Sequence, residues 1–158
     1  MTNVLSILDV VDLGIEKEKA RRDFYALVAE RFDDAEMKKL FGQLRDWEAI
    51  HVKRFTKIKS SLKPAPRVES YPGEMEAYMR SLVDDRFYSE VSPDHFSSHV
   101  RTPLNAINYG ISFEKDAILF FMEMIKYVQS DNKDTIMELM EEERMHVIYL
   151  ENLRKKYV

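Results

Sequence analysis

The chain contains no cysteine among its 158 residues. Disulfides, thiolate-bound metals, iron–sulfur clusters and cysteine nucleophiles are therefore excluded within it. Any metal ion that this chain binds must be held by oxygen and nitrogen atoms. Glycine and proline are also scarce, with four and five residues respectively. This composition favours long helices over a turn-rich sheet protein.

Long apolar runs and basic blocks are missing as well. No stretch approaches the length of an apolar membrane span, and the segment 1–10 lacks a basic region followed by an apolar run. The formal net charge of −4 is spread along the sequence, which argues against electrostatic capture of nucleic acid. We therefore expect a cytoplasmic protein that associates with neither membranes nor nucleic acids.

The chain length suits one folded domain over 1–158 and leaves no room for a second one. Apolar residues recur at alternating steps of three and four in four long segments, which is the spacing of a helix face. We expect two antiparallel helical hairpins, over about 1–62 and 102–157, joined by a crossover over 63–101 that contains prolines and a short helix over about 74–88. The predicted fold class is all-α, a four-helix bundle with one long crossover.

The two predicted hairpins repeat the same short pattern. In each of them a glutamate followed by lysine precedes a Glu-x-x-His motif, at nearly the same spacing. These glutamates and histidines all fall where the helix spacing calls for an apolar residue. The residues of the repeat are Glu18, Glu48, His51, Glu114, Glu143 and His146. Four carboxylates and two imidazoles in this order are the ligand set of a dimetal site in a helical bundle.

The charge of these side chains requires compensation. Burying an unpaired carboxylate is strongly destabilising, but two divalent cations would balance four carboxylates while the histidines stay neutral. Residues three apart lie on one helix face, so Glu48 and Glu143 can each bridge two metals beside a histidine ligand. Glu18 and Glu114 would complete the two metals. Arg22 on the first helix could instead pair with one carboxylate.

Such a site would be reactive, because six ligands shared by two metals leave coordination positions open. Iron and manganese suit carboxylate and imidazole ligands, and open positions on paired metals of this kind favour reactions with oxygen species. The alternative is a metal-free interaction bundle, in which the glutamates turn outward and form ion pairs on the helix surface.

Several other polar or aromatic residues are expected to be structural. Trp47 is expected to pack between helices. His95 and His99 have the spacing of metal ligands on one helical turn, but few carboxylates surround them, so we expect surface histidines. Glu141 and Glu142 are expected to be solvated.

At the residues of the repeat, the chain resembles the rubrerythrin branch of the ferritin-like superfamily. The phrase Glu-Lys-x-x-x-x-Phe-Tyr, followed by Glu-x-x-His and then repeated, is similar to the signature of that branch. The resemblance covers about 1–62 and 102–157, and it implies a ferritin-like bundle that holds two iron ions. The iron ligands that it implies are Glu18, Glu48, His51, Glu114, Glu143 and His146. It also implies that Tyr25 is a catalytic aromatic hydroxyl beside them.

Two features differ from the rubrerythrin pattern. Typical members carry a cysteine-rich rubredoxin domain that supplies electrons, so this chain would need an external donor such as a rubredoxin-like protein. Typical members also have an extra carboxylate within one turn of the third-helix ligand. The residues around Glu114 at that spacing are the apolar Ile111, Ala117 and Ile118. This difference argues against the redox-linked iron movement that depends on the extra carboxylate.

The resemblance implies a di-iron oxidoreductase that reduces hydrogen peroxide or dioxygen in defence against oxidative damage. Two other metalloprotein functions stay open: a ferroxidase or iron-handling protein without a peroxide cycle, and a catalase-like enzyme with manganese or mixed metals. Apolar positions in the crossover, together with the resemblance, favour a homodimer, in which hairpins could be exchanged between subunits.

Overall fold

Four long helices form the bundle in the computed structural model, which describes residues 6–63, 73–82 and 85–158. They are α1 (Ile7–Arg31), α2 (Ala35–Ser61), α6 (Pro103–Met124) and α7 (Ser130–Arg154). Three short helices lie in the crossover, namely α3 (Glu74–Leu82), α4 (Asp85–Glu90) and α5 (Phe96–His99). The described residues contain no strand, and the predicted all-α class is confirmed.

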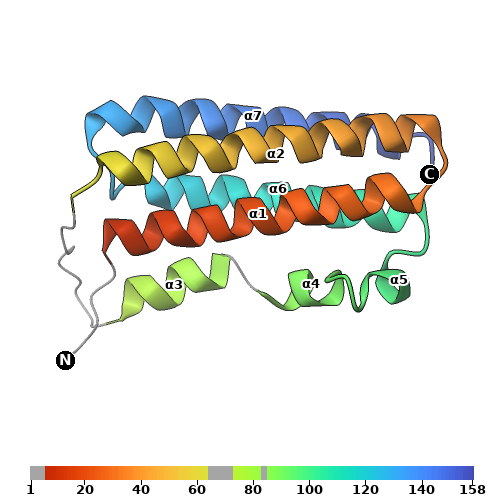
Figure 1. Ribbon diagram of the computed structural model, residues 1–158, viewed down its shortest axis with the longest axis horizontal. Coiled ribbons are helices and arrows are strands. Elements are labelled where there is room, and N and C mark those ends of the chain that lie inside the picture. The colour runs from red at the N-terminus through yellow and green to blue at the C-terminus, as the bar shows by residue number, and fades with distance from the viewer. Residues whose placement is uncertain (1–5, 64–72, 83–84) are drawn as a thin grey trace.

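The four long helices run side by side, as Figure 1 shows. The most extensive packing is between α1 and α2 and between α6 and α7, so these pairs are the two predicted hairpins. The crossover helices follow one side of the bundle from the end of α2 to the start of α6 (Figure 1), and α3 packs against α6. The predicted single crossover helix over 74–88 corresponds to α3 and α4, and its positions 83–84 lie outside the described residues.

Side-chain caps determine where three of the long helices begin. Ser6 and Thr102 each accept a hydrogen bond from the backbone N–H three residues later, and the side chains of Asp9 and Asn105 bond back, which completes two capping boxes. Asp34 accepts hydrogen bonds from the first backbone N–H groups of α2. Each such cap contributes about 1 kcal/mol to helix stability.

The core has two apolar clusters, one toward each end of the bundle, separated by a layer of polar side chains. The first cluster includes Val10, Phe55, Phe121 and Leu139. The second cluster includes Phe24, Phe41, Ile107 and Leu150. In each helix, the residues of the predicted repeat lie between the residues that belong to the two clusters. The apolar packing at both ends therefore holds the polar layer inside the bundle.

Gly14 allows α1 to approach α6 closely. A Cβ atom there would lie 2.9 Å from Met124 Cε and 3.2 Å from Phe120 Cε1, whereas a Cβ at Gly42 would meet only Arg45 Nη2, at 3.8 Å. We expect Gly14→Leu to lower the free energy of unfolding by about 1–3 kcal/mol through overpacking. The same substitution at Gly42 should raise it by up to about 1 kcal/mol through helix propensity. Urea unfolding of both variants tests this, and equal effects would contradict it.

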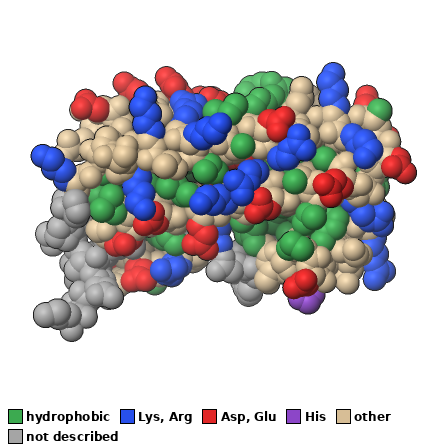
Figure 2. Space-filling view, viewed as in Figure 1, with side chains coloured by type: hydrophobic (Ala, Val, Ile, Leu, Met, Phe, Trp, Pro, Cys, Tyr) green, Lys and Arg blue, Asp and Glu red, His purple; other side chains and the backbone are tan. Residues whose placement is uncertain are grey.

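Charged side chains of both signs are mixed over the face of the molecule shown in Figure 2. None of the described helices combines the length and apolarity needed to span a membrane. Several large apolar side chains of α6 and α7 are more than one third exposed. They are Leu119, Met122, Met137, Met145, Ile148 and Tyr149. The homodimer stays a prediction.

Candidate metal centre

Six side chains from the four long helices meet in the polar layer. Because the repeat places them at matching heights on inward helix faces, the structure brings together every residue of the predicted ligand set. They are Glu18 of α1, Glu48 and His51 of α2, Glu114 of α6, and Glu143 and His146 of α7. The four glutamates and His51 are fully buried, and His146 is 3% exposed. The alternative in which the glutamates turn outward is therefore wrong.

Their ligand atoms form two overlapping groups, and the atoms of each group lie within 4.8 Å of one another. The group named here the Glu18 group consists of Glu18, Glu48, His51 and Glu143. The Glu114 group consists of Glu48, Glu114, Glu143 and His146. Glu48 and Glu143 belong to both groups, so they lie between the two positions at which a cation would be surrounded by ligands.

Each histidine directs its Nδ1 atom toward the carboxylates. His51 Nδ1 lies 3.0 Å from Glu143 Oε1 and 3.3 Å from Glu18 Oε2. His146 Nδ1 lies 2.9 Å from Glu143 Oε2 and 3.3 Å from Glu114 Oε1. The two imidazole rings are stacked with their centroids 5.6 Å apart. Since a neutral histidine binds a metal through one ring nitrogen, both rings are oriented to share a cation with the carboxylates.

Six oxygen and nitrogen atoms of these glutamates and histidines form no hydrogen bond of good geometry with a described residue, although some lie close together, such as His146 Nδ1 and Glu143 Oε2 at 2.9 Å. The six atoms are Glu18 Oε2, Glu48 Oε1, Glu48 Oε2, Glu114 Oε2, Glu143 Oε2 and His146 Nδ1. A buried polar atom without a partner costs about 1–3 kcal/mol, and such atoms are uncommon in folded proteins. These atoms belong to five of the six residues in the two groups, which fits a site that holds two cations.

The pKa values of the layer reflect burial and charge crowding. Burial raises the pKa of Glu18 and of Glu114 to about 7, because desolvation disfavours the charged carboxylate. Burial alone would lower the pKa of both histidines, but the surrounding carboxylates outweigh it. They raise the pKa of His146 to about 12 and that of His51 well above its usual range. Without a metal ion, this layer therefore retains protons at neutral pH.

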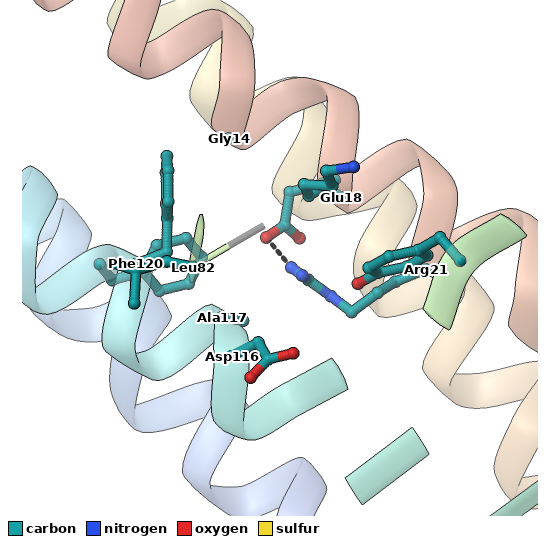
Figure 3. Close-up of a pocket in the computed structure, with 10 residues that line it drawn as sticks. Gly14, Glu18, Arg21, Leu82, Asp116, Ala117 and Phe120 are labelled. Carbon is teal, nitrogen blue, oxygen red and sulfur yellow. Dashed lines mark hydrogen bonds and ion pairs between the residues drawn. The ribbon is translucent and has the colours of Figure 1, made fainter. Parts of the chain in front are cut away.

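The polar layer also contains a cationic side chain, Arg21, that was not predicted from the sequence. Its side chain is 2% exposed and forms a buried ion pair with Glu18, toward which it points in Figure 3. Arg21 Nη2 also lies 3.6 Å from Glu143 Oε1, and Arg21 Nε lies 3.7 Å from Glu48 Oε1. The guanidinium thus neutralises part of the negative charge in the layer.

The buried face of α1 is broader than predicted, which explains why Arg21 was missed. A second buried stripe with the same spacing lies beside the predicted one. It consists of Val10, Gly14, Lys17, Arg21, Phe24 and Val28. Its glycine, lysine and arginine suggest a solvent-facing surface when only the sequence is considered. The predicted pairing of Arg22 with a site carboxylate is wrong, because Arg22 lies toward solvent and bonds to Asp23 at 2.9 Å.

Glu142 is partly exposed, in line with the expectation of a solvated side chain, but it also contacts the site from outside. Its Oε2 atom lies 2.7 Å from His51 Nε2, and its Oε1 atom accepts a hydrogen bond from Arg54 Nη1 at 2.8 Å. A carboxylate on the outer nitrogen of a histidine fixes the orientation of the ring. Here it keeps His51 Nδ1 directed at the layer. The neighbouring Glu141 is exposed, as predicted.

Tyr25 lies at the Glu114 side of the layer. It is fully buried, and its hydroxyl donates a hydrogen bond to Glu114 Oε1 at 2.5 Å. Burial and the charge of Glu114 raise the pKa of Tyr25 well above its usual value, so the phenol keeps its proton. The matching position in the second half is Phe121, which has no hydroxyl, and this hydrogen bond therefore has no counterpart from that position.

Trp47 lines the centre rather than only packing between helices. Its ring stacks on His146 with a centroid distance of 5.1 Å. Trp47 and Glu142 each stand immediately before the glutamate of a Glu-x-x-His motif. Each of them contacts the histidine of the other motif, since Trp47 stacks on His146 and Glu142 contacts His51. His95 and His99 are exposed, as predicted.

A small cavity lies beside Glu18 and Arg21, between α1, α6 and the crossover (Figure 3). Its volume is about 10 Å³, which is room for about one water molecule. The residues around it include Gly14, Glu18, Arg21, Leu82, Asp116 and Phe120. This cavity would admit a molecule of a few atoms and is too small for an organic substrate.

Comparison with known proteins supports the fold. No protein-family model matches the chain, and no curated protein matches it. A solved structure of a protein from Thermotoga maritima, assigned as a ferritin-like diiron-carboxylate protein, is similar over 100% of both chains, with 21% sequence identity and a TM-score of 0.70. Similarity at this identity shows the fold, which is ferritin-like. It does not distinguish the rubrerythrin branch.

Proposed function

We propose that this chain is a dimetal-carboxylate protein that holds two iron ions in the polar layer. The observation that carries the proposal is that six buried glutamates and histidines gather in two overlapping groups, and that five of them keep at least one ligand atom without a hydrogen bond. Glu18 and His51 would hold one ion, and Glu114 and His146 the other. Glu48 and Glu143 would contribute to both ions. Iron suits this ligand set, and the similar Thermotoga protein is assigned as a diiron-carboxylate protein.

The proposed reaction is the reduction of hydrogen peroxide or dioxygen, as in rubrerythrins. The resemblance of the repeat and the small volume of the cavity support a small oxidant. When bound, iron supplies the electron-transfer steps. Within the protein, Tyr25 holds a proton beside Glu114, and the apolar clusters on both sides exclude bulk water. Electrons come from an external donor, because the chain has no cysteine with which to build a rubredoxin centre.

Anaerobic loading with Fe²⁺ followed by peroxide tests this reaction. One peroxide takes two electrons and two protons to give two water molecules, so one equivalent per chain should oxidise two Fe²⁺ ions. A reductant should then restore the starting state. Peroxide that leaves the iron reduced would contradict the proposal. Oxygen evolution from peroxide without a donor, from protein loaded with manganese, would support the catalase-like function instead.

A ferroxidase or iron-handling role is the second candidate, and the surroundings of Glu114 favour it. Ile111 and Ala117 are buried one turn away on either side of Glu114, where rubrerythrins have a further carboxylate. The number of iron ions per chain after aerobic addition of excess Fe²⁺ separates the two functions. Two ions support a redox centre, and many ions support iron handling.

We expect Tyr25→Phe to retain both iron ions and to slow oxidation of the reduced centre by peroxide about a hundredfold, the usual effect of losing a positioned proton donor. Stopped-flow absorption measures this rate. Tyr109→Phe is the matched control, because the Tyr109 hydroxyl donates to a different carboxylate, Glu90 Oε2, at 2.9 Å. Equal rates in both variants would show that the Tyr25 hydroxyl has no part in the reaction.

A further inference from the structure

Arg21 distinguishes the two halves of the centre. Its guanidinium pairs with Glu18, and its nitrogen atoms lie within 3.7 Å of oxygen atoms of Glu48 and Glu143. Glu48 and Glu143 are shared by both groups, whereas Glu18 belongs to the Glu18 group alone. Among the ion pairs of the described residues, none joins Arg21 to Glu114, the carboxylate that belongs to the other group alone. The internal cation is therefore placed on one side of a site whose ligands are otherwise duplicated.

The charge balance makes this asymmetry important for metal binding. Two divalent ions already neutralise the four carboxylates, so a fully loaded layer that still contains Arg21 carries one excess positive charge. Like charges within a buried layer repel strongly, because the effective dielectric constant there is far below that of water. Arg21 has little room to move aside, since the adjacent cavity has a volume of about 10 Å³.

The surroundings of Arg21 hold the guanidinium in place. Tyr88 of the crossover lines the same cavity, and Lys17 Nζ, itself buried, lies 5.0 Å from the centre of the Tyr88 ring. Lys17 and Asp116 both line this cavity, so the space beside Arg21 has charges of both signs. The ion pair with Glu18 holds Arg21 in the layer, and a divalent ion in the Glu18 group has to compete with this pair.

We propose that Arg21 is a resident counter-cation of the Glu18 group, so that the two halves of the centre load in a fixed order with unequal affinity. The first divalent ion binds the Glu114 group and leaves the pair between Arg21 and Glu18 intact. The second ion has to displace the guanidinium from Glu18 and binds more weakly. This inference rests on the proposed dimetal function and adds the order of binding to it.

Calorimetric titration of the metal-free protein with Mn²⁺ under anaerobic conditions tests the order. The wild type should bind two ions in separate steps, with the second at least about tenfold weaker, a difference of about 1.4 kcal/mol. Arg21→Met should tighten the second step by about tenfold or more, and by a larger factor than the first step, because Arg21 forms its ion pair with Glu18, which belongs to the Glu18 group alone. Arg22→Met is the matched control, because it removes the same charge at the adjacent, partly exposed position, where the side chain pairs with Asp23, and both steps should stay as in the wild type.

Two further variants show which group of ligands binds the first ion and which binds the second. They test the inference even if Arg21→Met does not fold. His146→Ala should abolish the tight step, whereas His51→Ala should abolish the weak step. Three results would each overturn the inference without contradicting metal binding itself. They are equal affinities of the two steps in the wild type, loss of the tight step in His51→Ala, and an unchanged weak step in Arg21→Met. Absence of Mn²⁺ and Fe²⁺ binding in the wild type would instead contradict the proposed function itself.

Discussion

Glu48→Gln combined with Glu143→Gln should reduce the bound metal from two ions per chain to none. Both glutamates belong to the Glu18 group and to the Glu114 group, so the double variant removes two of the four ligand residues of each group and half of the negative charge. An amide keeps the shape of the side chain but is a much weaker ligand for a divalent ion than a carboxylate.

The matched control for this variant is Glu36→Gln combined with Glu141→Gln. These residues lie on the same two helices, α2 and α7, and both are exposed. Elemental analysis after dialysis against Mn²⁺ or anaerobic Fe²⁺ gives the number of ions in each protein. Two ions should remain in the control. Two ions in the Glu48 and Glu143 variant would exclude the polar layer as the binding site.

Metal loading should raise the melting temperature by about 10–20 °C. A ligand at one hundred times its dissociation constant stabilises the folded state by about 2.7 kcal/mol, so two ions contribute about 5 kcal/mol. In a chain of this size, each kcal/mol shifts the melting temperature by about 2–4 °C. The ions bind the folded state preferentially, because the six ligand residues come together only there.

Thermal unfolding followed by circular dichroism measures this shift, with and without a chelator. The chelator should return the loaded protein to the melting temperature of the metal-free form. The variant with glutamine at positions 48 and 143 should show no shift on metal addition. Identical melting temperatures for loaded and metal-free wild type would mean that the ions do not bind within the folded bundle.

The bundle and the six residues of the polar layer could be predicted from the sequence because both depend on helix periodicity. Glu48 and His51 are three residues apart on an apolar helix face, and so are Glu143 and His146. The spacing within each helix is therefore enough to predict that these side chains face the core. Helix caps such as Thr102 are also local. Long-range packing was not needed to recognise these features.

The residues that the sequence analysis missed depend on how the helices are rotated and paired. Arg21 is inward because the buried face of α1 is wide enough to include Gly14 and Lys17. Glu142 reaches His51 because α7 packs beside α2. Periodicity within a single helix does not specify either relation. The choice between positions 21 and 22, both within one turn of Glu18, was therefore decided by tertiary packing.

Iron content after anaerobic reconstitution tests the central claim most directly. The account predicts two iron ions per chain, retained through gel filtration and lost in the variant with glutamine at positions 48 and 143. No more than trace iron in the reconstituted wild type would contradict it.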